Sequence, residues 1–352
     1  MQNKTRLLTE TFLSTVAGLS GVADASTTFT VAPAVEQKLE ARIKASSEFL
    51  SKINVIPVIN QKGEKLAVGV NRTLAGRTDT TSADRQPGNV GDPAKINGYT
   101  CEKTNFDSEL RYAQLDAWRH HENFQILIRD SIVAQQSSDR IMIGWNGTSC
   151  AATTNRTTNP LLQDVNKGWL HHIRTDAPLH VVSDGDLTAD ATKAIYVGEG
   201  TVGTDVDYRS LDALVLDAKK MIPAHRRGDT SLVVIIGHDL LDDKYFTIAQ
   251  RTGAQATEVE ATDRILQSSK QIGGLPAIAV PHFPANAILI TSLKNLSIYY
   301  QEGTRRRHIA DEPKRDRYVN YESVNEAYVV EDYDITALVE NIVMGLKPTG
   351  GG

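Results

Sequence analysis

A polar, turn-rich stretch from Ile53 to Tyr112 limits most strongly what this chain can fold into, because it separates two segments with helical spacing. Loops longer than about 12–15 residues are uncommon in compact domains and are usually functional or disordered. This one contains strand-like runs at 53–59, 66–70 and 99–102, and its tip at 73–92 is rich in Thr, Asp, Arg and Gly. The pattern predicts a long two-stranded flap. Because an isolated ribbon is only marginally stable in water, we expect it to lie on a neighbouring molecule.

The composition narrows the class of protein. The chain has 352 residues, of which 40% are hydrophobic, as is ordinary for a folded protein with one large domain or two to three smaller ones. The net charge of -5 gives no overall basic surface for nucleic acid. No apolar run reaches the roughly 18 residues of a membrane span. Two cysteines, Cys101 and Cys150, are too few for a disulfide framework, so we expect reduced thiols.

The first residues predict an amphipathic helix rather than a signal peptide. Leu8, Phe12, Val16 and Leu19 recur at helical spacing, whereas polar residues interrupt the apolar core that a signal peptide needs. A small, polar, Ser/Thr-rich gap at 25–28 follows. We interpret it as an exposed linker, the kind of segment where proteolysis concentrates.

Three further helices are predicted in the first half of the chain. The first covers 34–51, directly after Pro33. Asp116 can cap the second, which continues to Asn146-Gly147 and would form a spine about 45 Å long. The third is predicted to begin at Leu161, after Asn159-Pro160.

The second half of the chain has a different pattern of predicted secondary structure. From 181 to about 293, strand-like and helical segments alternate, as in a compact α/β module. Within it, Ser210 can cap a helix, and Leu232 to Ile236 form an apolar run typical of a buried strand. The last section, 296–345, is rich in strand-like segments and tyrosines, which suits a half-buried sheet.

Motifs for enzyme chemistry are weak. Residues 198–203 match the glycine pattern of a dinucleotide-binding turn, but the next helix is expected only near Ser210, and Asp205 and Asp207 would repel phosphate. The histidines of each adjacent pair, at 120–121 and 171–172, do not share a helix face, so neither pair can chelate a metal alone. We therefore predict no catalytic, cofactor-binding or metal-binding residues, and no cofactor.

Two groups of charged residues are candidate contacts between subunits. Arg305, Arg306 and Arg307 form the densest basic cluster, for which contact with nucleic acid is the alternative interpretation. The flap carries charges of both signs, which suit pairing between subunits better than binding to a polyanion. The candidate flap contacts are Lys62, Lys65, Arg72, Arg77, Asp79, Asp84 and Arg85.

Several strings of residues give the chain a specific resemblance. The segment N-P-L-L-Q-D-V-N-K-G-W-L at 159–170 looks like the corresponding segment of P2-type major capsid proteins of tailed bacteriophages. The similarity extends from about Thr5 to Gly345. Further matching strings are S-L-D-A-L-V at 210–215, the segment 240–246 with its D-K-Y-F end, L-S-I-Y-Y at 296–300, N-Y-E-S at 320–323 and Y-V-V-E-D-Y at 328–333.

The resemblance implies an α+β chain with the HK97-like capsid fold. In that fold an N-terminal arm and an extended flap, the E-loop, precede a peripheral domain with a spine helix, into which an α/β axial domain is inserted. The implied divisions are an N-terminal segment that acts with a scaffold and is cleaved (1–29), the arm (30–53), the flap (54–112), the peripheral domain (113–180), the axial domain (181–293), the peripheral return (294–345) and a flexible tail (346–352).

The same resemblance implies the function and partners. The chain would assemble with other copies of itself, as pentamers and hexamers, into an icosahedral shell around double-stranded DNA that it holds without sequence preference. It would belong to the virion capsid, assembled in the host cytoplasm, with no membrane contact. An internal scaffold, a maturation protease and a portal protein are the other implied partners. The implied cleavage region is Thr28, Phe29 and Thr30.

Two other functions stay open at this stage. An encapsulin-like cellular compartment would use the same fold to enclose protein cargo. A nucleotide-binding enzyme would use the glycine turn at 198–203, and in that case Gly200→Val should abolish a nucleotide-induced thermal shift.

Overall fold

The computed structural model describes residues 3–65, 75, 77–85, 97–118, 124–187, 193–250 and 270–348. The α-helices of these ranges are α1 (Asn3–Ser20), α2 (Pro33–Ala45), α3 (Glu48–Lys52), α4 (Tyr112–Trp118), α5 (Phe124–Asn146), α6 (Trp169–Asp176), α7 (Leu211–Ala218) and α8 (His238–Gln250). The short 3₁₀ helices are η2 (Pro178–His180), η3 (Lys219–Met221), η4 (Leu293–Asn295), η5 (Pro313–Arg315) and η6 (Tyr333–Ile335).

The strands of the same ranges form two larger sheets and two strand pairs. The first sheet contains β1 (Phe29–Thr30), β2 (Asn54–Val58), β5 (Glu102–Asn105), β6 (Ser108–Arg111), β13 (Leu296–Gln301), β14 (Arg306–Glu312) and β15 (Arg317–Val330). The second contains β7 (Val181–Val182), β9 (Leu232–Ile236), β10 (Gln271–Ile272), β11 (Leu275–Ala279), β12 (Ile288–Ser292) and β16 (Ala337–Val339). The pairs are β3 (Lys62–Lys65) with β4 (Asn97–Thr100), and β8 (Ile195–Val197) with β17 (Ile342–Met344).

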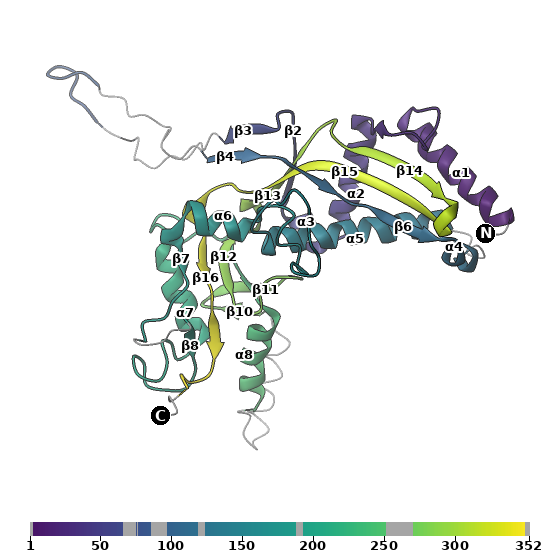
Figure 1. The fold of residues 1–352 in the computed structure, drawn as a ribbon. Helices are drawn as coiled ribbons and strands as arrows, with labels where there is room; N and C mark the ends of the chain where they lie inside the picture. The colour runs from purple at the N-terminus through teal and green to yellow at the C-terminus, as the bar shows by residue number, and fades with distance from the viewer. Residues whose placement is uncertain are drawn as a thin grey trace, which may run out of the picture.

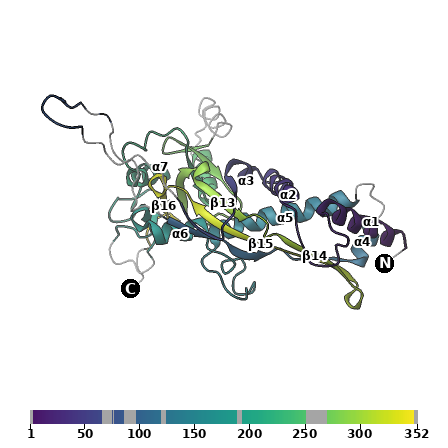
Figure 2. The same cartoon turned by 90° about the horizontal axis from the view of Figure 1, so that it is seen from above.

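The subunit has two lobes set at an angle (Figure 1). The long lobe holds α1, α2, α5 and the first sheet, and we call it the peripheral lobe. The second lobe holds α7, α8 and the second sheet, and we call it the axial lobe. Seen from above, α5 and the long strands β14 and β15 run along the peripheral lobe together (Figure 2). The ribbon β3–β4 lies against the peripheral lobe, whereas the described residues 77–85 lie apart from both lobes (Figure 1).

The peripheral sheet is built around β15. Its strand order is β1-β14-β15-β13-β2, and β5 and β6 also pair with β15. At the far edge, β2 runs parallel to β13, with Val55 opposite Ile298. Residues 54–58 of the run at 53–59 therefore belong to the sheet and not to the flap, whose first described strand is β3. The run predicted at 66–70 lies outside the described residues. Within the last section, which was predicted to be rich in strands, β15 is one continuous strand of 14 residues.

The axial lobe contains the strand predicted at Leu232–Ile236 and the helix predicted after Ser210, but its sheet also takes β16 from the stretch predicted as the peripheral return, because β16 pairs with β12. Its sheet has the order β10-β11-β9-β12-β16-β7, and β9 is the predicted apolar run at Leu232–Ile236. Ser210 caps α7 through a hydrogen bond that its Oγ accepts from the Ala213 amide, at 3.2 Å. The faces of the sheet are covered by aliphatic side chains, including fully buried Val234, Ile236 and Ile290.

The spine is α5, which at 23 residues is about 35 Å long at 1.5 Å per residue. It ends at Asn146 as predicted, and the Gly147 amide donates to the Ile143 carbonyl at 2.8 Å. The predicted cap was wrong. Asp116 lies inside α4 and not at its start, because that helix already begins at Tyr112.

The segment after the spine is a loop where a helix was predicted. Leu162 has a φ of 58°, a left-handed conformation that interrupts a right-handed helix, and α6 begins only at Trp169. The loop is held in place by polar contacts: the Thr148 amide donates to the Gln163 carbonyl, and the Asn166 side chain donates to the Glu326 carbonyl. These contacts position Trp169 so that its side chain is buried in the core.

Trp169 lies at the junction of the two lobes. Its ring packs edge-on against Trp145 of the spine, with centroids 4.9 Å apart, and its Nε1 donates to the Ser297 carbonyl at 3.0 Å. The same core includes Ile298 from the peripheral sheet and Leu289 from the axial sheet. The lobes therefore share one hydrophobic core.

The N-terminal helices differ in one detail from expectation. The amphipathic helix predicted at the start is α1. The helix predicted over 34–51 is divided into α2 and α3, because the chain leaves the helix at Ser46 and Ser47 begins a new one by capping the Leu50 amide. Both cysteines are free thiols. Within the described ranges, every helix is too short or too polar to cross a membrane.

Candidate functional site and assembly surfaces

The base of the ribbon β3–β4 is anchored by one aromatic side chain. Tyr99 of β4 packs edge-on against Tyr299 of β13, with ring centroids 5.0 Å apart. Gly63, which lies opposite Tyr99 in the ribbon, leaves room for that ring, since a Cβ there would come within 2.7 Å of it. The Cys101 amide also donates to the Gln61 carbonyl at 2.8 Å. These contacts fix where the ribbon leaves the subunit.

The candidate flap contacts are exposed wherever the structure describes them. Residues 77–85, which include Arg77, Asp79, Asp84 and Arg85, are exposed throughout. Hydrogen bonds from Thr81 to the carboxylate hold the pKa of Asp79 below its usual value. Lys62 is also exposed. Arg72 and the Lys65 side chain lie outside the described residues. Contact with another subunit remains a prediction for all seven.

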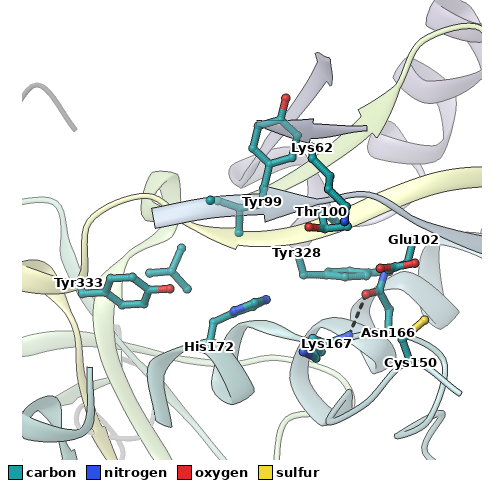
Figure 3. A pocket seen from close by; sticks show the side chains of 14 residues that line it. Lys62, Tyr99, Thr100, Glu102, Cys150, Asn166, Lys167, His172, Tyr328 and Tyr333 are labelled. Atoms are coloured by element: carbon teal, nitrogen blue, oxygen red, sulfur yellow. Dashed lines mark hydrogen bonds between the residues drawn. The ribbon is translucent and has the colours of Figure 1, made fainter. Parts of the chain in front are cut away.

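A polar cavity of about 420 Å³ opens beneath the ribbon (Figure 3). Lys62, Thr100 and Glu102 line it from the ribbon and its base, and Lys167 and His172 line it from the opposite side. Asn166 is held at its floor, where its Oδ1 accepts a hydrogen bond from the Lys167 amide at 2.8 Å. Charges of both signs therefore meet at the base of the flap.

The two thiols near this region are poor nucleophiles. Burial raises the pKa of Cys101 to about 12, and nearby carboxylates contribute. Burial also raises the pKa of Cys150, which lies at the cavity edge. Because the thiolate is the reactive form, neither environment activates a cysteine for catalysis.

The N-terminal segment packs on the outer end of the peripheral lobe. Phe12 and Leu13 of α1 line an apolar pocket together with Ile128 of the spine and Tyr318 of β15. After α1, the chain returns as β1, which pairs with β14 so that Phe29 lies opposite Arg307. The amphipathic face of α1 is thus used within the subunit.

The predicted cleavage region has two parts with different accessibility. Of the linker predicted at 25–28, residues 26–28 are exposed, whereas Ala25 is buried and packs in the small core beneath α1. Phe29 is buried, and Thr30 is paired with Arg306 in the sheet. A protease would therefore reach Thr28 more easily than the bond between Phe29 and Thr30.

The prediction that Arg305 contacts another subunit is wrong. Its side chain is fully buried within the subunit and pairs with three carboxylates, those of Glu36, Glu40 and Glu322. The sequence suggested a surface patch because three arginines are adjacent. In an extended chain, however, consecutive side chains point to opposite faces.

The two following arginines have different surroundings. Arg306 is exposed, and contact with another subunit remains a prediction for it. Arg307 is half-buried, and its Nε donates to the Asn320 side chain at 2.6 Å. Burial lowers the pKa of its guanidinium. The basic cluster is therefore not a continuous surface for nucleic acid.

Sequence reasoning missed the charges that pair with Arg305. Arg140 of the spine donates to Glu40 of α2 at 2.7 and 2.9 Å, and to Glu326 of β15. Glu36, Glu40 and Ile43 follow one another at helical spacing, so both acids lie on the buried face of α2. The sequence did contain a signal for this cluster, because two glutamates lie on the otherwise apolar face of a predicted helix.

The glycine turn at 198–203 is a loop, as predicted. The next helix, α7, begins only at Leu211, so the glycine turn does not lead directly into a helix as a dinucleotide-binding turn would. The Thr201 amide instead donates to the Asp205 carboxylate at 2.9 Å. No group of three or more metal-ligating side chains occurs within the described ranges. His120 and His121 lie outside those ranges.

Comparison with known proteins identifies the protein family. The chain matches the family described as "Phage major capsid protein, P2 family" over residues 8–342. It is 46% identical to the capsid proteins of Escherichia phage P2, over 98% of this chain and 96% of that sequence. It is 39% identical to the major capsid protein of Serratia phage KSP20, over the full length of both.

A solved structure agrees with these relatives. A chain from the procapsid of satellite phage P4, which includes the size determination (Sid) protein, superposes with a TM-score of 0.79 at 43% identity. The match covers 98% of this chain and 99% of that one.

The two-lobed fold with its projecting ribbon is thus the α+β, HK97-like capsid fold, and the chain is a shell-forming subunit. It belongs to the P2 family of phage major capsid proteins. Its function is to form the capsid shell of a tailed phage, as a component of the virion. The family favours this shell over the encapsulin-like compartment.

Proposed function

We propose that the chain assembles as pentamers and hexamers into an icosahedral shell around double-stranded DNA, and that the ribbon β3–β4 lies on an adjacent subunit. The observation that carries this proposal is the ribbon itself. Tyr99 fixes its base, while the described tip at 77–85 is exposed throughout. A two-stranded ribbon is marginal alone, and a neighbouring subunit would supply the surface that it needs. Many such contacts, closed by symmetry, make a shell.

Charge reversal at the two ends of the flap tests this proposal. Lys62→Glu and Asp84→Lys invert charges at the ribbon base and at its tip, and Lys62→Arg and Asp84→Glu are matched controls that keep them. Negative-stain electron microscopy of the overexpressed chain should show closed shells or hexameric sheets for the wild type and the controls. The reversed variants should give mainly small particles. If the reversed variants assemble as the wild type does, the charges of Lys62 and Asp84 do not contribute to contacts between subunits.

A second part of the proposal concerns residues 1–29. They would act with an internal scaffold before a maturation protease removes them, at a bond near Thr28, Phe29 and Thr30. The exposure of 26–28 supports this position. Intact-mass analysis of the subunit from mature particles tests it. A new N-terminus within 27–31 is expected, and an intact N-terminus in particles filled with DNA would contradict it.

The remaining partners follow from a shell filled with DNA. We propose a portal protein at one vertex and contacts with DNA that do not depend on sequence. The net charge of -5 supports weak, non-specific holding rather than tight binding, because a shell must hold the genome and also release it. We assign the chain no catalytic role.

A further inference from the structure

The interior of the peripheral lobe holds six charged side chains that shell assembly does not explain. They come from four elements: α2, the spine α5, β15 and the turn before β14. We call them the buried charge cluster. Its members are Glu36, Glu40, Arg140, Arg305, Glu322 and Glu326, and every one is at most 4% exposed.

The two arginines hold the cluster together. Arg140 binds Glu40 through both terminal nitrogens, at 2.7 and 2.9 Å, and its Nε donates to Glu326 at 2.9 Å. Arg305 donates to Glu40 and to Glu322. Glu40 of α2 thus bridges both guanidinium groups, and it ties the N-terminal arm to the spine and to the sheet.

The cluster has too many carboxyl groups for its cations. Two guanidinium groups face four carboxyl groups. A buried charge without a partner is costly enough that such groups neutralise instead of remaining ionised. If Glu40 and Glu322, which hydrogen bond to Arg305, are the two anions, the cluster is neutral when Glu36 and Glu326 each hold a proton.

The hydrogen bonds single out the same two residues. Glu326 Oε2 and Glu36 Oε1 are buried oxygens without a hydrogen-bond partner among the described residues. Glu36 Oε1 lies 3.7 Å from Arg305 Nε, beyond hydrogen-bond distance. Both oxygens of Glu40 and both of Glu322, by contrast, accept hydrogen bonds. An unpaired oxygen is far less costly on a neutral carboxyl than on an anion.

We propose that the buried charge cluster is a proton-dependent clasp, in which protonated Glu36 and Glu326 allow the N-terminal arm to stay docked on the spine, and loss of those protons loosens α2.

Several other charged and titratable groups surround the buried charge cluster. Arg307 interacts electrostatically with Glu322 but hydrogen bonds to Asn320, not to a carboxyl of the cluster. Beside α2, Glu302 adds negative charge near Glu36 and so disfavours its ionised form. The uncharged groups that interact with the cluster are Cys101, Tyr300 and Tyr328. Asp139 interacts with Tyr328.

The direction of the pH dependence follows from the separate residues. Burial raises the pKa of Glu36 and of Glu326, against the opposing effect of the arginines. Protonated carboxyls therefore keep the arm docked at low pH, and docking weakens as pH rises through these raised values. Burial also acts on Glu40, but Arg140 and Arg305 outweigh it and hold its pKa below the usual value. The stability that Glu40 contributes is present above its ordinary pKa and is lost as pH falls through the lowered value.

Two measurements on the full-length chain test the clasp. Infrared spectroscopy of the wild type at neutral pH detects protonated carboxyl groups directly. Hydrogen–deuterium exchange of α2 is then compared at equal pH between the wild type and Glu36→Gln/Glu326→Gln, whose amides mimic protonated carboxyls. Comparison at the same pH removes the intrinsic pH dependence of exchange. Glu40→Gln/Glu322→Gln is the matched control, because it removes the two anions instead.

The clasp predicts an infrared band for buried protonated carboxyls in the wild type that is lost in Glu36→Gln/Glu326→Gln. It also predicts equal exchange of α2 at mildly acidic pH and, because only the wild-type carboxyls can ionise, about tenfold faster exchange in the wild type at alkaline pH. The control should lose protection of α2 at both pH values. Absence of the band in the wild type overturns the proposal even if a variant fails to fold. Equal exchange at alkaline pH overturns it too.

Discussion

The two sheets of this subunit are stabilised by different means. The axial sheet is buried under aliphatic side chains such as Val234, Ile236 and Ile290. Beside the peripheral sheet, the interior also contains the charged groups of Arg140, Arg305 and four glutamates. Aliphatic packing tolerates many arrangements of about the right volume, whereas hydrogen-bonded ion pairs accept few. The charged interior of the peripheral lobe therefore requires four distant segments to meet in one hydrogen-bonded arrangement, a requirement that the aliphatic faces of the axial sheet do not impose.

This difference has a consequence for assembly. The peripheral lobe carries the ribbon, which we propose to contact an adjacent subunit, and residues 1–29, which we propose to act with a scaffold. A small error in the docking of α2 would displace both. Buried ion pairs contribute little net stability in many proteins, and we infer that here they specify one position of the arm on the spine.

The largest expected effect comes from breaking the charge cluster on one side. Arg140→Met leaves the proposed anions Glu40 and Glu322 with Arg305 as the one remaining guanidinium of the cluster, and it should lower the free energy of unfolding by about 3–5 kcal/mol. Urea denaturation followed by circular dichroism measures it. Arg42→Met is the control, because Arg42 is exposed on α2, the helix that carries Glu40, and pairs with Asp130 only at 3.9 Å. If Arg140→Met loses no more stability than the control, the buried ion pairs do not stabilise the peripheral lobe.

An aliphatic truncation in the axial sheet should cost somewhat less. Ile236→Ala deletes a fully buried side chain between β11 and β12, and about 2–4 kcal/mol of the unfolding free energy should be lost. Because no titratable group is involved, this loss should be the same at mildly acidic and alkaline pH. Leu216→Ala, on the exposed face of α7, should change stability by less than about 0.5 kcal/mol. A pH-dependent loss for Ile236→Ala would erase the distinction between the lobes.

A third variant tests the junction of the lobes. A Cβ at Gly144 would overlap the Trp169 ring, so Gly144→Ala forces the spine away from α6 at an expected loss of about 1–3 kcal/mol. The wavelength of tryptophan fluorescence should shift as well, since Trp145 and Trp169 pack together. Gly228→Ala is the control, because open space surrounds that position. An unshifted spectrum at wild-type stability would mean that the junction is loosely packed.

The smallest expected effect lies at the cap of α7. Ser210→Ala removes the hydrogen bond to the Ala213 amide and should lower the unfolding free energy by about 1 kcal/mol. Ser210→Asp should retain most of it, because an aspartate oxygen can accept the same bond. Thermal unfolding of the two variants side by side measures the difference. Equal melting of Ser210→Ala and Ser210→Asp would show that the cap is dispensable.

The sequence predicted best what depends on neighbouring residues. The cap at Ser210, the strand at Leu232–Ile236 and the end of the spine at Asn146 all follow from local patterns, and all are confirmed. The errors involve long-range partners. The run at 53–59 looked like part of the flap because nothing local shows that β2 pairs with β13, about 240 residues later.

The same limit applies to the candidate contacts. Arg305 looked like a surface residue because its partners, Glu36, Glu40 and Glu322, come from distant segments. Leu161 looked like a helix start after Asn159-Pro160, but tertiary contacts of the loop with β15 and with the end of the spine override that local signal. The family resemblance supplied the capsid fold and function, which no local pattern could have given.

The most direct test of the proposed assembly is electron cryomicroscopy of the assembled shell at a resolution that traces the chain. The ribbon β3–β4 should leave its own subunit at Tyr99 and continue over the peripheral lobe of an adjacent subunit, with Arg77 to Arg85 in contact with that neighbour. A ribbon that folds back on its own subunit, or that touches no neighbour, would contradict the account.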